Sequence, residues 1–314
     1  MPDDLTDLDP DLSRRDRDDW IAGLDEIGEA HGYLERPGGD HLALFVDAGP
    51  KLLVTFESRE RAQGRPRGQP RGLQLARENG WSLLAIVAEP DTWYRGDRLY
   101  RYFDRLIDDG FFEDFDATLF FGAHDGGYAA AAYSVASPGC RVLALRPVAT
   151  LDPRVARWDR RYHDRRGLDF TSRYGYAPDM IEAADRATIV ADLGHAPDAM
   201  HAALFRAPNV RILDAPLVGQ RLEQSLDQFG ILVSMIEAAM DGQLTQGRFA
   251  QLWRARRDNM PYLKGLLRKL DTAGRIPLAA AVARHGARTG TPDPFVTWLS
   301  DNGFKLPETA TIDG

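Results

Sequence analysis

The alternation of apolar and polar positions divides the chain into a region of alternating strands and helices, followed by a region of helices alone. Residues 83–88 are almost continuously apolar, as a strand buried on both faces requires. Residues 99–107 repeat apolar side chains every three or four positions and predict an amphipathic helix. Strands predicted at 117–121 and 141–145 flank an alanine-rich helix predicted at 128–137. This succession favours a right-handed crossover within a parallel sheet.

The remaining pattern predicts three regions. Residues 1–17 are rich in Asp and Arg, and we expect them to be frayed. Between residues 18 and 216 the pattern predicts two further helices, at 18–33 (ending near Gly32) and at 73–79. It also predicts a hairpin of strands 41–46 and 52–56 around a turn at 47–50, and a breaker-rich loop at 63–72. Two more strands are predicted at 187–191 and 210–213.

Two further segments stand apart from this α/β region. Residues 152–180 are rich in Arg and Tyr and too long for an ordinary loop, so we expect an insertion or cap there. Residues 217–314 show no strand pattern and predict a helical region with segments at 222–240, 246–256, 262–270, 278–285 and 294–299. The basic cluster at 253–257 in this region is expected to be a solvated or inter-domain face.

The composition and the net charge limit the classes of partner that the protein is expected to bind. The 314 residues are 44% hydrophobic, enough for one large domain with a helical appendage. A net charge of −8 with interspersed signs predicts neither nucleic-acid nor membrane binding. The single cysteine, Cys140, allows no internal disulfide, and the first residues lack the pattern of a secretory signal. We therefore expect a soluble cytoplasmic protein that binds a small molecule or a protein partner, with oligomerisation through the C-terminal helices as one option.

The most informative stretch runs Phe120-Phe-Gly-Ala-His-Asp-Gly-Gly-Tyr-Ala-Ala130. It places small residues on both sides of His124, where a strand turns sharply into a helix, and glycine tolerates the close backbone approach that such a turn needs. The helix start would point free N–H groups and the positive end of a dipole at whatever lies above it. Gly122, Asp125, Gly126 and Gly127 are therefore candidate ligand-binding residues.

This stretch resembles the G-x-S-x-G-G nucleophile elbow of the α/β-hydrolase fold, and the order of elements from 42 to 220 fits that superfamily. The resemblance implies a three-layer α/β architecture with a mostly parallel sheet and no cofactor. It also implies an acid at Asp192 and a base at position 220. His124 stands in place of the nucleophilic serine and Gln220 in place of the histidine, so the Ser–His–Asp relay is incomplete.

The run from 81 to 153 is also similar to a group of bacterial hydrolase-like proteins, some of which carry the label of phosphoadenosine phosphosulfate reductases. Such reductases need a Ser-Gly-Gly-type phosphate loop and a cysteine near the C-terminus. The chain has neither, because Cys140 lies mid-chain at a helix–strand junction. The motifs therefore do not support a reductase.

Three functional hypotheses remain open. The first is a degenerate, non-catalytic binding or scaffold module. The second is an esterase or acyltransferase in which His124 attacks or acts as a base, Asp192 orients it, and His195 or His201 replaces the missing histidine. The third is binding of a phosphate, sugar phosphate or carboxylate by the elbow N–H groups and by Arg146.

Two further sets of residues are candidates, one for an oxyanion N–H and the other for a zinc site. Glu57, Ser58 and Arg59 follow a strand, and the corresponding loop of the resembling fold supplies an oxyanion N–H. His124, Asp192, His195 and His201 are of the types that bind zinc, but no pair has the i, i+4 spacing of a helical zinc motif. We predict no metal site.

Overall fold

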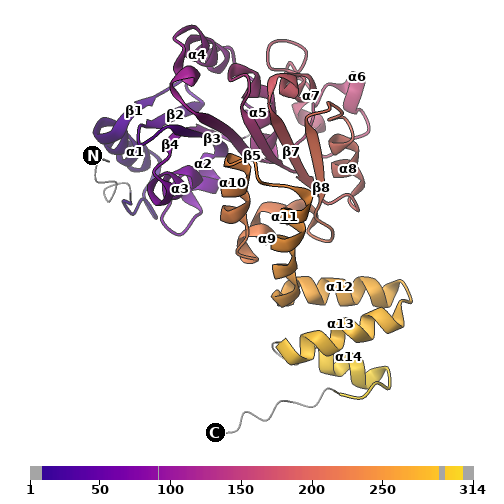
Figure 1. Ribbon diagram of the computed structural model, residues 1–314. Helices are drawn as coiled ribbons and strands as arrows, with labels where there is room; N and C mark the ends of the chain where they lie inside the picture. The colour runs from indigo at the N-terminus through magenta and orange to yellow at the C-terminus, as the bar shows by residue number, and fades with distance from the viewer. Residues whose placement is uncertain (1–8, 91, 290–293, 307–314) are drawn as a thin grey trace.

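The computed structural model describes residues 9–90, 92–289 and 294–306. Within them, eight strands form one sheet in the order β1-β2-β4-β3-β5-β6-β7-β8 (Figure 1). β2 runs antiparallel to both neighbours, and the other neighbouring strands are parallel. The strands are β1 (Gly32–Glu35), β2 (His41–Val46), β3 (Lys51–Ser58), β4 (Ser82–Ala88), β5 (Ala117–Ala123), β6 (Arg141–Leu145), β7 (Arg186–Ala191) and β8 (Val210–Asp214).

Helices cover both faces of the sheet, and each face has its own core. One core holds Trp20 and Met235 and is formed with α1 (Arg17–His31), α3 (Arg71–Asn79), α9 (Leu222–Gln228) and α10 (Leu232–Met240). The other holds Phe103 and is formed with α4 (Asp97–Asp108), α5 (Asp125–Tyr133), α7 (Ala177–Met180) and α8 (Ala196–Ala202). Because side chains alternate along a strand, Phe120 and Phe121 of β5 enter opposite cores. The architecture is three-layer α/β.

Short helices fill the connections. The 152–180 segment contains α6 (Pro153–Ala156), η4 (His163–Arg165) and α7, and it lies over the carboxyl end of the sheet. The remaining short helices are α2 (Arg59–Gln63), η2 (Phe111–Asp114), η3 (Ser134–Ala136), η5 (Ile181–Ala183), η6 (Gly219–Arg221), α11 (Gln246–Leu252) and η7 (Trp253–Asp258).

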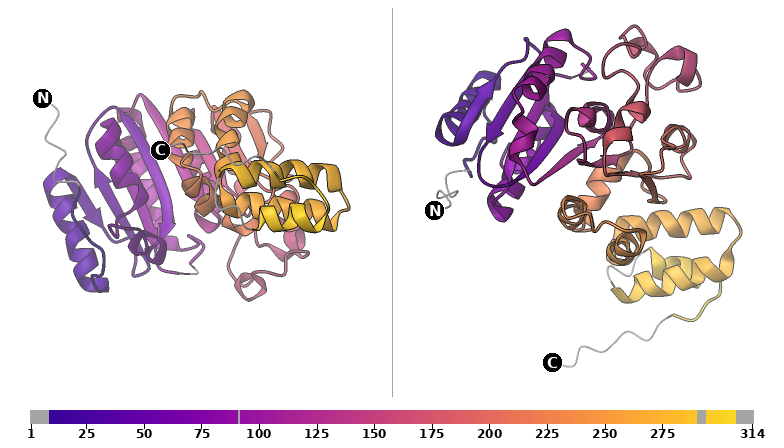
Figure 2. Two further views of the ribbon diagram at one scale, coloured as in Figure 1. Left: turned by 90° about the horizontal axis from the view of Figure 1, so that it is seen from below. Right: turned by 45° about the horizontal axis from the view of Figure 1, so that its top comes forward.

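The last helices form a unit that projects from the sheet domain (Figures 1 and 2). They are α12 (Met260–Thr272), α13 (Ile276–Thr289) and α14 (Phe295–Asp301). Their buried side chains form a separate small core that includes Leu263, Leu267, Ala283 and Phe295. We call these three helices the C-terminal unit.

Most predicted elements are confirmed, but the hairpin is wrong. β2 pairs with β1 and β4, whereas β3 lies between β4 and β5. β1, which was not predicted, is the true hairpin partner of β2. β3 is buried along nearly its whole length, and a place between two parallel strands covers both of its faces and both of its edges. The turn at 47–50 therefore leads across β4 and does not fold β3 back onto β2.

The N-terminal prediction also needs correction within the described residues. Leu12 is buried, its N–H donates to the carbonyl of Arg67, and Asp9 forms ion pairs with Arg67 and Arg77. Residues 9–16 are thus held against the breaker-rich loop and the end of α3, and they are not frayed. Residues 1–8 lie outside the described residues.

Several helix boundaries differ from the prediction, and two of the differences have a clear local cause. The helix predicted over 222–240 is divided into α9 and α10 at Gly230, whose φ of +68° is incompatible with a continuing helix. α5 begins at Asp125, three residues before the predicted start, because the elbow turns within a single residue. None of the described helices combines the length and the apolar character that crossing a membrane would take.

Candidate functional site

The turn between β5 and α5 is a strained elbow centred on His124. Its φ of 60° and ψ of −114° are unfavourable for a residue with a side chain. A Cβ on Gly122 would lie 2.1 Å from the carbonyl oxygen of Gly126, and one on Gly126 would lie 2.1 Å from that of Phe56. Only glycine fits these two positions. The strand order, the antiparallel β2 and this strained strand-to-helix turn decide the architecture.

The chain has the α/β-hydrolase fold. The predicted fold class is thereby confirmed, and His124 occupies the place of the nucleophile at the carboxyl end of the sheet. Asp192 directly follows β7, and Gln220 lies in η6 beyond β8. The structure thus places an imidazole after β5, a carboxylate after β7 and a carboxamide in η6 beyond β8.

Both ring nitrogens of His124 have partners. Nδ1 lies 3.0 Å from Oδ1 of Asp125, and Nε2 contacts the hydroxyl of Tyr162. The neutral tautomer that satisfies both contacts donates from Nδ1 to Asp125 and accepts the tyrosine proton at Nε2. Burial lowers the pKa of His124 below its usual 6.5, and the charges of Arg146 and Arg61 lower it further against the opposing effect of Asp125. The imidazole is therefore neutral and fully engaged.

Aromatic side chains close one side of the elbow. The ring of Trp93 lies 5.4 Å from that of His124 and 5.0 Å from that of Tyr162, centroid to centroid. Tyr162 comes from the 152–180 segment, and Phe170 of the same segment also packs on Trp93. On this side the elbow is covered by rings, which leaves the opposite side as its open face.

Asp125 is the first residue of α5, and its side chain is turned away from solvent. His124 is the residue that precedes the helix, whereas the Asp125 carboxylate is largely buried and lies 3.2 Å from Nη2 of Arg61. Although burial acts to raise the pKa of Asp125, the hydrogen bond from His124 and the charge of Arg61 lower it. Nη1 of Arg61 also donates to the carbonyl of Ala123 at 3.0 Å. Arg61 and Asp125 therefore form a clamp over the elbow.

Asp192 has a different role from the one that an orienting acid would have. Its Oδ1 accepts the N–H of Gly194 at 3.0 Å, and its Oδ2 accepts the N–H of Gly219 at 2.9 Å. These bonds tie the loop after β8 to the end of β7. No recorded contact among the described residues joins Asp192 to His124. The carboxylate thus positions the loop that carries Gln220.

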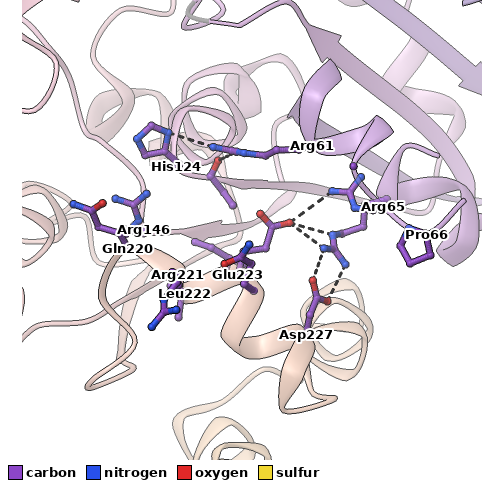
Figure 3. A pocket seen from close by; sticks show the side chains of 15 residues that line it. Arg61, Arg65, Pro66, His124, Arg146, Gln220, Arg221, Leu222, Glu223 and Asp227 are labelled. Carbon is purple, nitrogen blue, oxygen red and sulfur yellow. Dashed lines mark hydrogen bonds and ion pairs between the residues drawn. The ribbon is translucent and has the colours of Figure 1, made fainter. Parts of the chain in front are cut away.

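A cavity of about 520 Å³ opens beside His124 and has two halves (Figure 3). We call the half in which the arginines are paired with carboxylates the closed half, and the other the open half. In the closed half, Arg71 forms a two-bond ion pair with Asp227 at 3.0 and 2.6 Å and also contacts Glu223 at 3.1 Å. Arg65 contacts Glu223 there as well, at 3.8 Å. Cations and carboxylates balance one another in this half. The open half is lined by Arg61, His124, Arg146, Gln220 and Arg221.

Arg146 is the least satisfied group of the open half. It follows β6 with a φ of +48°, another strained position for a residue with a side chain. Its Nη1 is buried and has no hydrogen-bond partner among the described residues, and the nearest carboxylate, that of Asp198, is 3.7 Å away. Arg221 is exposed at the rim and forms no recorded ion pair with a described residue. The open half therefore carries more positive charge than Asp125, which pairs with Arg61, and the more distant Asp198 balance.

The two other candidate histidines belong to a neighbouring network around Asp159 and Asp198, and the Asp198 carboxylate lies 3.7 Å from Nη1 of Arg146. His201 is fully buried, with Nε2 2.9 Å from Oδ2 of Asp159 and Nδ1 accepting the N–H of Ala149. Asp159 also binds Arg161, which donates to Asp198, and His195 contacts that same Asp198 at 2.8 Å. No recorded contact among the described residues links either histidine to His124. Their placement gives neither of them the role of a base at the elbow.

Glu57 does not lie in the loop where the sequence places it. It is inside β3, buried, and its carboxylate accepts the N–H of Arg71 at 2.8 Å and contacts Arg65. Ser58 ends the strand and caps α2 by accepting the N–H of Arg61. Glu57 therefore holds Arg65 and Arg71 of the closed half in place. Among the described residues, no group of three or more His, Cys, Asp or Glu side chains is placed to hold a metal ion.

Sequence reasoning missed most of the cavity. Arg65 and Arg71 come from the predicted breaker-rich loop, Arg61 from α2 just before it, and Tyr162 from the insertion. A signal was present, since residues 61–71 repeat arginine between glycine and proline residues. Arg146 was the one cavity cation that its position after a strand identified.

Comparisons with known proteins add little to this picture. No family model matches the sequence, and no curated protein sequence matches it. The capsule O-acetyltransferase of Neisseria meningitidis serogroup A is similar in structure at 13% identity over 65% of this chain and 95% of that one, with a TM-score of 0.42. The carboxylesterase EstE1, cloned from a metagenomic library, shows 13% identity over 68% and 87% with a TM-score of 0.42.

A third structure, carboxyl esterase 2 from the fungus Tuber melanosporum, shows 14% identity over 71% of this chain and 86% of that one, with a TM-score of 0.40. Identities and TM-scores this low carry no argument about chemistry. The fold assignment rests on strand order and on the elbow.

Proposed function

We propose that this protein is a non-catalytic binding module of the α/β-hydrolase fold that holds a small oxyanion, such as a phosphate ester or a carboxylate, in the open half of the cavity. The observation that carries this proposal is Arg146, a cavity-lining residue whose buried Nη1 has no hydrogen-bond partner among the described residues and only a 3.7 Å ion pair with Asp198. A buried donor without an acceptor is costly, and an oxyanion would supply the missing acceptor. Arg221 and the amide of Gln220 would complete the site.

The strain at the elbow and after β6 supports the same view. His124 and Arg146 follow neighbouring parallel strands, and both have left-handed backbone conformations. Strained residues persist where the surrounding structure fixes them, and they are concentrated at functional sites. Here both strained residues line one cavity.

The state of His124 argues against acyl transfer. Attack by Nε2 would require Tyr162 to leave it, and Nδ1 is committed to Asp125. Gln220 has an amide that cannot accept the proton, and no recorded contact among the described residues brings another histidine to His124 to act as the base. The retained elbow is then a rigid frame that places Ala123 and His124 in the wall of the cavity.

Thermal shift at constant ionic strength tests the binding proposal. We expect sulfate and phosphate, but not chloride, to raise the melting temperature of the full chain. Arg146→Gln should abolish this shift, whereas Arg160→Gln, a change at an exposed arginine outside the cavity, should leave it intact. Equal shifts in both variants, or no shift with any oxyanion, would contradict the proposal.

Turnover measurements test the non-catalytic part. p-Nitrophenyl esters and acyl thioesters should be hydrolysed no faster by the wild type than by His124→Ala. Turnover that disappears in His124→Ala and weakens in Asp192→Asn would instead establish the rewired hydrolase. Its pH profile would then report a histidine whose pKa lies below 6.5.

A further inference from the structure

Charge is distributed unevenly between the two parts of the chain. Residues 246–289 contain ten Lys and Arg against two Asp, a net charge of +8. The whole chain carries −8, so the rest carries −8 − 8 = −16. Nine of those ten cations are exposed, and none forms a recorded ion pair with a described residue. In the sheet domain, by contrast, most arginines near the cavity and the loops are paired with carboxylates.

The exposed cations of α13 surround an apolar side chain. Leu278, Ala281, Arg284 and Arg288 follow one another at intervals of three or four residues and therefore share one helix face. Leu278 is 54% exposed. Arg275 lies just before the helix. We call these five residues the α13 stripe, and it lies on the unit that projects from the sheet domain (Figure 2).

The sheet domain carries a surface of the opposite kind. The end of α4 and the adjoining η2 present Asp108, Asp109, Glu113, Asp114 and Asp116, all of them exposed. Residues 106–140 contain no Lys or Arg, and none of the five carboxylates forms a recorded ion pair with a described residue. Ile107 at the start of this surface is 40% exposed. We call Ile107 and the five acids the acidic corner.

We propose that the α13 stripe of one copy of this chain docks on the acidic corner of a second copy. Each surface has one exposed apolar side chain with charges of a single sign around it, which is the pattern of an anchor with a polar rim. Opposite charges steer the two surfaces together and fix their orientation. The surfaces differ, so the contact is head-to-tail and generates rings or open chains.

The observations favour a second copy over a nucleic acid. A polyanion would be attracted by the stripe but repelled by the −16 charge of the rest of the chain. A second copy has both charges in the places that the contact needs. The stripe and the corner lie outside the cavity residues, so this interaction and anion binding are tested separately.

Sedimentation velocity on the full chain tests the proposal. At about 0.1 M salt we expect concentration-dependent association that is lost at about 1 M, where the screening length falls to about 3 Å. Arg275→Glu/Arg284→Glu and Asp109→Lys/Glu113→Lys should each weaken association at least about tenfold, because like charges then face one another. Arg160→Glu/Arg206→Glu makes the same change in net charge as Arg275→Glu/Arg284→Glu, but at exposed positions elsewhere, and should leave association unchanged.

Mixing the two reversed variants gives the decisive result. The unaltered stripe of one meets the unaltered corner of the other, so the equimolar mixture should associate although neither variant does so alone. Circular dichroism and melting temperature check that each variant is folded. A wild type that stays monomeric at low salt, a mixture that stays monomeric, or a monomer that binds heparin through the stripe would overturn the proposal.

Discussion

His124 and His201 lie in surroundings built from the same kinds of side chain. Each imidazole contacts an aspartate, Asp125 or Asp159, and each packs against a tryptophan ring. In each case an arginine binds that aspartate. The difference is that the His201 network is closed, with its charged groups paired and the ring fully buried, whereas the His124 cluster opens onto a cavity beside an unpartnered guanidinium nitrogen.

This contrast teaches that residue types do not separate a structural site from a binding site. What separates them is whether the polar atoms are satisfied within the chain. A closed network contributes to stability and specificity, and its disruption leaves a buried charge uncompensated. An open cluster with an unsatisfied group contributes less to stability and has capacity left for a ligand.

The largest expected effect comes from breaking the closed network. Asp159→Ala should lower the free energy of unfolding by about 3–5 kcal/mol, because it leaves Arg161 and His201 without their shared partner in a buried place. Urea unfolding followed by circular dichroism measures this. Asp164→Ala, at an exposed carboxylate of the same segment, should change the value by less than about 0.5 kcal/mol. Similar losses in both variants would show that Asp159 has no special role.

The matching change in the open cluster should behave in the opposite way. Arg146→Gln should lower the unfolding free energy of the anion-free protein by less than about 1 kcal/mol, since its Nη1 makes no hydrogen bond and its ion pair with Asp198 is long, at 3.7 Å. In the presence of sulfate, however, the unfolding free energy of the variant should be lower than that of the wild type by about 1.5–3 kcal/mol, the range for a hydrogen bond to a charged group. A variant that is strongly destabilised without anion would place Arg146 with the structural network.

The pH dependence of stability should report on His201. Burial lowers its pKa below 6.5 against the opposing effect of Asp159, so the unfolded chain binds the proton more readily. The stability conferred by the neutral ring is therefore present above pH 6.5 and lost as the pH falls below it, by at most about 1.4 kcal/mol per pH unit for one proton. His201→Gln should flatten this slope between pH 6.5 and 5, and His163→Gln, at an exposed site, should not.

The smallest expected effect is at the rim of the cavity. Arg221 is exposed, so its charge is screened, and Arg221→Gln should weaken sulfate binding by only about 0.2–1 kcal/mol. Titration calorimetry at two salt concentrations measures this, and the difference from wild type should shrink at the higher one. A loss of sulfate affinity as large as that of Arg146→Gln would show that Arg221, and not Arg146, is the main contact of the anion.

The sequence predicted the parts of the fold that depend on local pattern. Strand β6 was predicted with its observed bounds, and Gly80 and Gly32 were placed at the ends of α3 and α1. These features depend on apolar runs and on glycine, which act within a few residues. β1 was missed because four residues with one short apolar run give too little pattern. The hairpin was wrong because pairing partners depend on which strand covers which edge.

The candidate site divides along the same line. The sequence singled out His124 and Arg146 because each follows a strand, and parallel strands bring their carboxyl ends together. It missed Tyr162, Arg61 and Arg221, which reach the site from the 152–180 segment, from α2 and from η6 beyond β8. It also offered His195 as a substitute base, whereas the structure places that ring on Asp198 in another cluster.

What the sequence by itself determined is a glycine-tight strand-to-helix turn that bears an imidazole, because a backbone approach of this closeness admits only glycine on either side. Only the tertiary structure decided which polar groups are satisfied. It engages both nitrogens of His124, closes His201 into a network and leaves one nitrogen of Arg146 without an acceptor. The physical reason is that hydrogen bonding requires atoms from distant segments to meet within about 3 Å, and no local pattern encodes that meeting.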